Sequence, residues 1–480
     1  MDILKDSSAY AVFKKFKRIS EIPRCSHDEE KISKFIYDFG RQLNLDTQRD
    51  EFGNVIIRKP ASEGYEDRDA ITLQAHLDMV CEKTDDSTHD FCHDPISLIV
   101  DGDIIKADRT TLGADDGIGV ALIMALLEDN SLKGPQIEAL FTTTEETGMD
   151  GALGLSDSVL IGKRLINLDN EEDKMIFVGC AGGVGATITS EIETIIDEDL
   201  INFEIRVFGL QGGHSGSMIN EPRSNANKLL DSVLLKLKSN LEFKLAQFTG
   251  GTKHNAIPSQ AKAIIGVKRE DIEQLKKSFD EYTHEIKDSL IKRELDLDFS
   301  LSETEHENIY IKEDLSNRIL RLIQLFPHGV NTMDKELDIV RSSNNLAIVN
   351  ANKDKFELIT SLRSTDEDDL EYLKDLVNNL ASSNNFTIEF SDGYPMWKPS
   401  FDNRLLNKAK EVYKNLRNED ADVTVIHAGL ETGIISEKYP NMDMISIGPN
   451  ITGAHTPNEK LSISSTEFVF TFVKELINNL

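Results

Sequence analysis

Five short segments of the chain place carboxylates or histidines beside apolar runs, a pattern typical of metal-dependent hydrolysis. Taken singly, each has a simpler interpretation: adjacent acids between glycines, for example, can be a solvated turn. The segments are Thr72-Leu-Gln-Ala-His76-Leu-Asp78, Gly113-Ala-Asp115-Asp116-Gly117, Leu140-Phe-Thr-Thr-Thr-Glu145-Glu146, Leu165-Ile-Asn-Leu-Asp169 and Ile447-Gly-Pro-Asn-Ile-Thr-Gly-Ala-His455.

Spacing within two of these segments indicates a division of roles. Asp78 follows His76 by two residues, so its carboxylate can orient an imidazole that binds an ion. Glu145 and Glu146 are adjacent, and neighbours on an extended chain point in opposite directions. One of them can therefore hold an ion while the other faces a substrate.

Together the segments predict a two-metal centre, because acids and histidines recur where apolar strands are expected to end. α/β folds place their sites at the carboxyl ends of strands. Oxygen-rich ligands with a minority of histidine suit zinc, manganese or cobalt, and the ligand count fits two ions sharing one carboxylate. Such ions acidify a water and polarise a carbonyl, and a nearby carboxylate must then move the proton to the leaving amine.

The elements around these segments alternate between strand and helix. Apolar runs at 54–58, 70–74, 138–143 and 164–168 predict strands, and 120–127 predicts a buried helix. Ser26-His-Asp-Glu29 has the form of a capping box before a helix with apolar residues at 32, 35, 36, 39 and 43. This alternation predicts an α/β fold with a mixed, mainly parallel sheet sandwiched between helices.

A different pattern, with long helices and alternating strands, occupies the middle of the chain. We predict a catalytic α/β domain in two parts, residues 1–186 and 394–480, interrupted by an inserted α+β lid domain at 187–393. The stretch from Ala263 to Leu275 resembles that from Glu357 to Leu370, as two repeated halves of the insertion would. Chance similarity between two strand–helix units explains the match equally well. After Trp397 the α/β pattern returns, ending in a helix near 468–476.

Bulk composition excludes several partner classes. Among 480 residues, 84 acidic and 53 basic side chains give a net charge of −31, which repels nucleic acid and anionic lipid. No apolar run approaches the about 20 residues that span a bilayer, and we expect no signal peptide. Cys25, Cys81, Cys92 and Cys180 show neither CxxC spacing nor the density of a disulfide framework. The expected compartment is the reducing cytoplasm, with the cysteines in structural roles.

The ordered motifs resemble those of the co-catalytic zinc exopeptidases, and most closely the cytosolic aminoacyl-histidine dipeptidases among them. The resemblance runs through nearly the whole chain. It is carried by His76-Leu-Asp-Met-Val-Cys-Glu-Lys, His89-Asp-Phe, Asp94-Pro-Ile, Thr110-Thr-Leu-Gly-Ala-Asp-Asp-Gly-Ile-Gly, Thr144-Glu-Glu-Thr-Gly-Met, Leu168-Asp-Asn-Glu-Glu, Gly179-Cys-Ala-Gly-Gly, Gly212-Gly-His-Ser-Gly and His427-Ala-Gly-Leu-Glu.

The resemblance implies a role for each candidate ligand. Asp115 would bridge two divalent ions, most simply zinc, with a cis peptide following it. One ion would add Glu146 and His455, and the other His76 and Asp169. Glu145 would be the general base, and Asp78 would support His76.

The resemblance also implies substrate contacts from the lid. His214 would stabilise the oxyanion, Arg363 would pair with the substrate carboxylate, and Asn255 and Gly429 would lie near the substrate. A turn histidine and a surface strand arginine are the simpler interpretations of His214 and Arg363. A duplicated lid would let His214 act within its own chain, whereas a single-copy lid would need a homodimer.

The expected function is hydrolysis of small peptides, above all Xaa-His dipeptides such as beta-alanyl-histidine. Within the same chemistry, an aminoacylase, a carboxypeptidase or a tripeptide aminopeptidase is the alternative. A catalytically silent binding protein is a second class, which the complete set of ligands and base disfavours.

Overall fold

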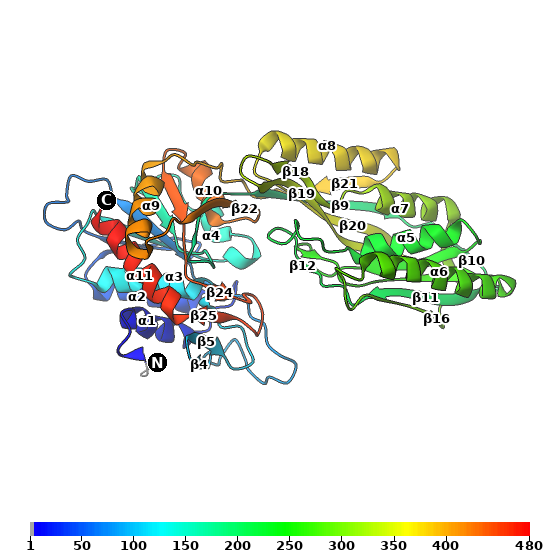
Figure 1. Cartoon of the computed structure of the whole chain (residues 1–480), viewed down its shortest axis with the longest axis horizontal. Coiled ribbons are helices and arrows are strands. Elements are labelled where there is room, and N and C mark those ends of the chain that lie inside the picture. Colours follow the sequence, from blue (N-terminus) through cyan, green and yellow to red (C-terminus); the bar gives the residue numbers. More distant parts are fainter. Residues whose placement is uncertain (1–3) are drawn as a thin grey trace. The chain divides into compact units, whose positions relative to one another are not determined.

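The computed structural model describes residues 4–480 and divides them into two compact units (Figure 1). The first unit comprises residues up to Cys180 together with Trp397–Val425 and Leu430–Leu480. The second comprises Ala181–Met396 and Ile426–Gly429. Compactness does not show where an independently folding domain ends, so the limits at 186 and 393 stay predictions.

The first unit is built on an eight-stranded sheet whose central strands are parallel. β6, β3, β7 and β23 run parallel to one another, whereas β1 and β2 on one side and β8 on the other are antiparallel to their neighbours. Every residue of β3 and β6 is buried, including the polar Thr72, Gln74 and Glu138, as expected for parallel strands covered on both faces. In spatial order the strands are β1 (Asp46–Arg49), β2 (Val55–Lys59), β6 (Ile137–Thr142), β3 (Ile71–His76), β7 (Arg164–Asn167), β23 (Asp443–Ser446), β8 (Met175–Cys180) and β22 (Asp422–Ile426).

Helices pack on this sheet and confirm the mixed α/β fold class. α3 packs on β3 and is covered by α1, α2 packs on β1 and β2, α9 packs on β23 beneath α11, and α10 packs on β8. A small sheet of four strands lies beside them. The helices are α1 (Tyr10–Ser20), α2 (Glu30–Gln42), α3 (Ala114–Glu128), α4 (Asp150–Gly154), α9 (Arg404–Arg417), α10 (Glu431–Lys438) and α11 (Ile463–Asn478), and the small sheet holds β4 (Leu98–Asp101), β5 (Ile104–Ala107), β24 (Ile451–Thr452) and β25 (Lys460–Ser462).

The predicted helix after residue 29 is confirmed, but its capping box is wrong. α2 begins at Glu30, and no side chain caps its first turn. Ser26 instead donates a hydrogen bond to Asp78 at 2.8 Å, and Glu29 accepts one from the Thr144 backbone at 3.1 Å. Partners in neighbouring loops therefore compete successfully for both side chains that would have formed the box.

The second unit is a nine-stranded antiparallel sheet with helices α5–α8 (green to yellow in Figure 1). β11 alternates buried Phe203, Ile205 and Val207 with more exposed residues, as expected for a sheet with one face on the core. The strands of the sheet are β9 (Gly182–Glu191), β11 (Ile201–Phe208), β13 (Lys244–Gly250), β15 (Ala261–Val267), β16 (Asp298–Glu303), β18 (Gly329–Asp334), β19 (Ile339–Ala351), β20 (Lys355–Ser364) and β21 (Thr387–Phe390). Two short pairs, β10 (Thr194–Ile196) with β17 (Ile309–Ile311) and β12 (Gly213–His214) with β14 (Ala256–Ile257), complete the strands.

The two stretches with similar sequences form similar elements. β15 leads through a short 3-10 turn, η3 (Arg269–Asp271), into α6 (Ile272–Leu290), and β20 leads into α8 (Glu367–Ser383). The other helices of the unit are α5 (Ala226–Lys238) and α7 (Glu313–Leu325). An origin of these strand–helix units by duplication stays a prediction.

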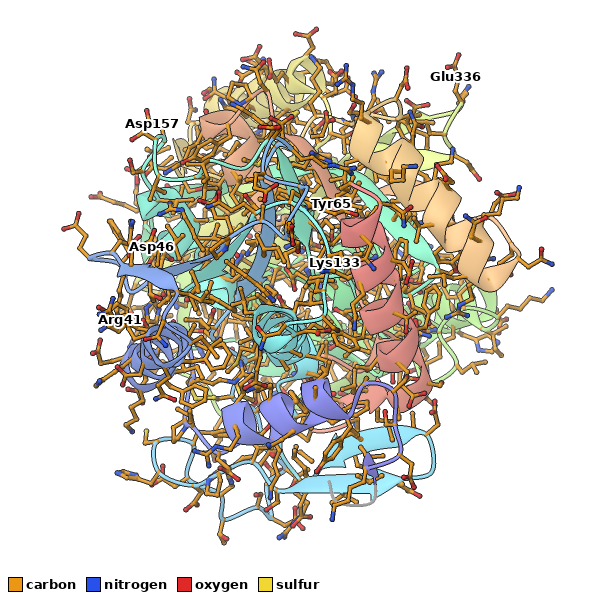
Figure 2. All side chains as sticks on the ribbon, turned by 90° about the vertical axis from the view of Figure 1, so that its left-hand side faces the viewer. Arg41, Asp46, Tyr65, Lys133, Asp157 and Glu336 are labelled. Atoms are coloured by element: carbon orange, nitrogen blue, oxygen red, sulfur yellow. A yellow bond between two sulfur atoms is a disulfide. The ribbon has the colours of Figure 1, made fainter. Side chains whose placement is uncertain are left out.

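Charged side chains cover the outside of the first unit. Figure 2 shows Arg41, Asp46 and Asp157 pointing away from the ribbon, and each is exposed. No helix within residues 4–480 is both long enough and apolar enough to span a bilayer.

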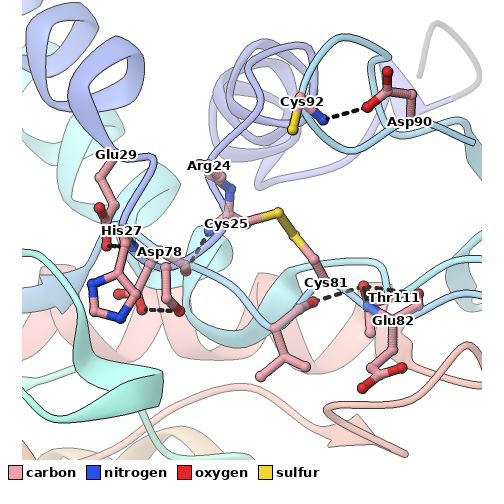
Figure 3. Close-up of a disulfide and its surroundings, with 12 residues drawn as sticks. Arg24, Cys25, His27, Glu29, Asp78, Cys81, Glu82, Asp90, Cys92 and Thr111 are labelled. Atoms are coloured by element: carbon pink, nitrogen blue, oxygen red, sulfur yellow. Dashed lines mark hydrogen bonds between the residues drawn. A yellow bond between two sulfur atoms is a disulfide. The ribbon is translucent and has the colours of Figure 1, made fainter.

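A disulfide joins Cys25 to Cys81, with their Cα atoms 5.8 Å apart (Figure 3). Cys92 is free and exposed, and Cys180 is free and buried. The spacing of the cysteines does not predict the bond, because 56 residues separate the partners. It links the loop after α1 to the loop after β3.

Candidate active site

The sheet of the first unit brings together the acids and histidines that the sequence singled out. His76 is the last residue of β3, Asp169 follows β7 by two residues, and Glu145 and Glu146 form the 3-10 turn η2 (Glu145–Thr147) after β6. Since β6, β3 and β7 are parallel neighbours, their carboxyl ends meet at one edge of the sheet.

Asp115 lies between two histidines that come from opposite ends of the chain. Its Oδ1 is 3.1 Å from His76 Nε2, and its Oδ2 is 3.0 Å from His455 Nε2. His76 Nε2 also lies 3.5 Å from Asp169 Oδ1, and His455 Nε2 lies 2.9 Å from Glu146 Oε2. The carboxylate of Asp115 thus faces one acid–histidine pair with each oxygen.

The start of α3 holds Asp115 in this position. The Asp115–Asp116 peptide is cis, as the resemblance implies. Asp116 accepts hydrogen bonds from the backbone N–H of His76 and of Gly119, both at 3.2 Å. Residue 119 must be glycine, since a Cβ there would lie 2.2 Å from Asp116 Oδ1.

Asp78 organises two of the ligand-bearing segments. Its buried carboxylate accepts hydrogen bonds from the backbone N–H of Glu145 at 3.0 Å and of Glu146 at 3.2 Å, besides that from Ser26. Its Oδ1 lies 3.3 Å from His76 Nδ1. A single side chain therefore orients both the imidazole at the end of β3 and the turn after β6.

The electrostatics of the cluster show an excess of buried negative charge. Burial, and then the charge of Asp115, raises the pKa of Asp169 to about 7, although His76 opposes the shift. Burial raises the pKa of Glu145 well above its ordinary range, and the charges of Asp169 and Glu146 add to this shift. Burial disfavours the charged form of Asp115 too, but the bonds from His455 and His76 hold its pKa below the usual value.

These residues fit divalent cations. Oxygen and nitrogen atoms converge within 4.8 Å of one another in three overlapping groups, His76/Asp116/Asp169, His76/Glu145/Glu146 and Asp115/Glu146/His455. The buried Oε1 of Glu146 has no hydrogen-bond partner among residues 4–480. Unpaired carboxylate charge of this kind is what a cation with oxygen ligands neutralises.

The four remaining predicted residues lie in the second unit. The backbone of Asn255 accepts a hydrogen bond from Ser215 N–H at 2.9 Å, which fixes it beside the β12 strand that ends at His214. His214 Nδ1 accepts hydrogen bonds from Gly216 N–H at 3.3 Å and Ser217 N–H at 3.2 Å. Because Nδ1 is an acceptor, the neutral imidazole carries its proton on Nε2.

Arg363 and Gly429 meet at one aromatic ring. Arg363, on β20, donates a hydrogen bond to the Tyr394 hydroxyl, and its side chain is only 6% exposed. A Cβ at Gly429 would lie 2.6 Å from Tyr394 Cε2, so glycine is required there. The alternative interpretation as a surface strand arginine is therefore wrong, because Arg363 is buried.

His427 belongs to the same cluster, although the sequence did not single out its side chain. Its Nε2 lies 2.7 Å from Ser343 Oγ. Burial, and then the positive charge of Arg363, lowers the pKa of His427 to about 3. The cluster therefore carries a fixed guanidinium charge beside a neutral imidazole.

Two further residues of the first unit were also missed. Arg24 donates hydrogen bonds to the carbonyls of Leu77 at 3.0 Å and Asp78 at 2.7 Å, next to the disulfide (Figure 3). Glu459 accepts hydrogen bonds from the backbone around Gly113. The only sequence signal for Glu459 was its position four residues after His455. No sequence signal singled out Arg24.

Comparison with known proteins decides the family. Residues 72–479 match the model of peptidase family M20/M25/M40. The chain belongs to this family. It is a metallopeptidase, and the resemblance noted in its motifs is confirmed.

Two M20 relatives match over the full length. The chain is 36% identical over 482 residues to the cytosol non-specific dipeptidase of Escherichia coli, covering 100% of this chain and 99% of the relative. The crystal structure of aminoacylhistidine dipeptidase from Vibrio alginolyticus superposes with a TM-score of 0.84 at 34% identity, covering 100% and 99% of the two chains. A tripeptidase from Staphylococcus aureus, at 16% identity, TM-score 0.57 and coverage of 98% and 97%, shares the fold.

Proposed function

We propose that this M20 metallopeptidase hydrolyses dipeptides in the cytoplasm, with Xaa-His dipeptides such as beta-alanyl-histidine as substrates. Two relatives that match over the whole chain are named as a cytosol non-specific dipeptidase and an aminoacylhistidine dipeptidase. The observation that carries the proposal is the position of Asp115, whose two oxygens face two acid–histidine pairs beside an additional carboxyl, Glu145.

Each of the two pairs would hold one divalent ion. His76 and Asp169 would bind the first, Glu146 and His455 the second, and Asp115 both. Zinc suits this set of ligands, and cobalt and manganese suit it as well. When bound, the ions supply Lewis-acid polarisation of the peptide carbonyl and lower the pKa of water.

Glu145 is the proposed general base. Its carboxyl lies within 4.8 Å of ligand atoms of His76 and Glu146, and Asp78 fixes its backbone through the N–H group. The carboxylate accepts a proton from the attacking water and donates it to the leaving amine, a role in which a positioned carboxylate contributes about 10²–10⁴ in rate.

The second unit supplies the proposed substrate contacts. Arg363 pairs with the terminal carboxylate of the dipeptide through its planar guanidinium. The Nε2–H of His214 donates to the developing oxyanion, an interaction whose loss typically costs about 10²–10³ in rate. Asn255 and Gly429 contact the peptide through polar groups. A homodimer is the assembly in which a partner subunit contributes His214.

A single pair of variants tests the mechanism. Glu145→Gln is expected to keep two ions per chain while kcat falls by about 10²–10⁴, because the amide cannot accept the proton. Glu51→Gln, an exposed carboxylate of the same unit, is the matched control and keeps full turnover. Undiminished kcat in Glu145→Gln refutes the assignment of the base.

Substrate class is tested separately by a hydrolysis screen on the metal-loaded wild type. Xaa-His dipeptides are expected to be cleaved with higher kcat/KM than tripeptides or N-acyl amino acids. A preference for N-acyl amino acids would identify an aminoacylase instead. Two bound ions with no hydrolysis of any of these would identify a silent binding protein.

A further inference from the structure

Glu459 places a buried carboxylate against the backbone that leads into Asp115. The side chain is 2% exposed. Its Oε2 accepts hydrogen bonds from the N–H groups of Leu112 at 2.7 Å and Gly113 at 2.9 Å, and its Oε1 accepts them from Ala114 at 2.7 Å and Asp115 at 3.3 Å. Four consecutive amides thus converge on one carboxylate.

This convergence requires a special backbone. Gly113 has a φ of +68°, which turns the chain so that successive N–H groups point the same way. These are also the first amides before and within α3, whose N–H groups have no partner inside the helix. The negative charge at a helix N-terminus is favourable, so Glu459 both satisfies the amides and complements the helix.

Arg24 binds the same segment through a backbone carbonyl. It is 2% exposed and donates to the carbonyl of Gly113, as well as to those of Leu77 and Asp78. The Gly113 carbonyl is therefore held by a cation and the amides of residues 112–115 by an anion. Glu459 and Arg24 each leave little room for this segment to move.

Glu459 also ends the loop that carries His455. The loop is closed by the pairing of β24 with β25, in which Ile451 lies opposite Leu461. Glu459 lies directly before β25, four residues after His455, and its own N–H donates to the Thr456 carbonyl at 3.1 Å. One side chain consequently connects the loop of His455 to the segment of Asp115.

We propose that Glu459 is a positioning residue that fixes the spacing between Asp115 and His455, two ligands of the same ion in the proposed centre. It acts through the amides of residues 112–115 and touches neither substrate nor ion. The inference rests on the ligand roles given to Asp115 and His455 under the proposed function.

The test compares Glu459→Gln with a matched control elsewhere in the first unit. The glutamine side chain has the same size, but its amide places an NH₂ group among the converging N–H donors. It therefore offers one acceptor oxygen where the carboxylate offers two. Asp103→Asn is the control: Asp103 likewise accepts a backbone amide at a helix start, that of Ser464 at 2.9 Å, but contacts no ligand segment.

Two readouts are independent of catalysis. In the metal-free protein, amide hydrogen exchange at 112–115 is expected to accelerate by about 10-fold or more in Glu459→Gln, because the N–H groups lose the carboxylate that accepts their hydrogen bonds. Titration with zinc should show about 10–100-fold weaker binding of one ion, as is typical when a partner that orients a ligand is lost. Asp103→Asn should match the wild type in both.

Turnover gives the third readout. At saturating zinc, kcat of Glu459→Gln should fall by about 10–100-fold while KM for the dipeptide stays within about threefold, since no substrate contact is removed. Glu459→Asp keeps the carboxylate and should recover part, but not all, of the zinc affinity and kcat, because its shorter side chain withdraws the carboxylate from the amides. The melting temperature should stay close to that of Asp103→Asn.

Two results overturn the proposal: wild-type zinc affinity and exchange in Glu459→Gln, or a Glu459→Asp variant as impaired as Glu459→Gln. If Glu459→Gln does not fold, Glu459→Asp decides, because reduced zinc affinity with a normal melting temperature supports the proposal and unchanged affinity refutes it. A wild type that binds two ions but cleaves no dipeptide refutes the proposed function alone, since the zinc and exchange comparisons need no substrate.

Discussion

Reducing the Cys25–Cys81 disulfide is expected to lower the melting temperature of the first unit but to change its turnover only slightly. The bond joins the segment of Arg24 to the loop that carries Asp78, which in turn orients His76 and the turn at Glu145. The same two segments are also held by the Met79 N–H, which donates to the Arg24 carbonyl at 3.1 Å. Loss of the disulfide therefore leaves Asp78 with most of its contacts.

The size of the stability change follows from the length of chain that the bond closes. With the partners 56 residues apart, the chain-entropy model gives about 4 kcal/mol of stabilisation through the unfolded state. For a unit of about 260 residues, an unfolding entropy of about 2.1 cal/mol/K per residue converts this to a fall of about 8 °C in the melting temperature. The loss in kcat is expected to stay below about 10-fold, because the other contacts of Asp78 persist.

Calorimetry and turnover, measured with and without a phosphine reductant, test this expectation. A phosphine is chosen because thiol reductants bind the metals that suit this centre. Cys81→Ser should reproduce the effect of the reductant and abolish any further response to it. Cys92→Ser is the control, since Cys92 is an exposed free thiol, and it should melt like the wild type.

Titration of denatured, unreduced protein should find two thiols per chain, those of Cys92 and Cys180. Four thiols, or a melting temperature indifferent to both the reductant and Cys81→Ser, would refute the reasoning. Disulfides are rare in reducing compartments, so in the proposed cytoplasmic location the bond is expected to be largely reduced.

Three further outcomes are expected. His455→Ala should lower the zinc content from two ions per chain towards one, as measured by elemental analysis, and two tightly held ions would remove His455 from the ligand set. Arg363→Met should raise KM for a dipeptide by about 10–100-fold, which corresponds to the free energy of a lost charged hydrogen bond. KM for the corresponding dipeptide amide should change little, and an equal effect on both substrates would exclude pairing with the carboxylate. Burial, and then the charge of Lys228, lowers the pKa of His328 to about 4, below its value in the unfolded chain. The unfolded state therefore binds more protons between these two pKa values, and the free energy of unfolding should fall by about 2 kcal/mol from about pH 7 to about pH 5. Urea unfolding of His328→Gln should show a smaller fall, and an identical one would refute the assignment.

The elements that carry the candidate ligands could be predicted because their signals are local. His76, Glu146 and Asp169 each follow a short apolar run, and these runs form β3, β6 and β7. The carboxyl ends of parallel strands then bring the side chains together without any further information. The fold class followed from the same alternation of strand and helix.

The contacts that support these ligands could not be predicted, because they pair side chains with distant backbone. Glu459 binds amides 344–347 residues earlier in the chain, and no periodicity or spacing encodes such a match. Arg24 reaches carbonyls at 77, 78 and 113 in the same way. The capping box at Ser26 and Glu29 was wrong for a related reason, since Asp78 and Thr144 offer both side chains a better partner.

The order of the candidate ligands along the chain has a consequence for biosynthesis. His76, Asp115, Glu146 and Asp169 are all made before the second unit begins, whereas His455 follows the whole of that unit. A nascent chain can therefore gather one acid–histidine pair early, but the pair around Glu146 stays without its imidazole until translation has passed residue 455. Under the proposed ligand roles, loading of the second ion, and with it full peptidase activity, would require translation to pass residue 455.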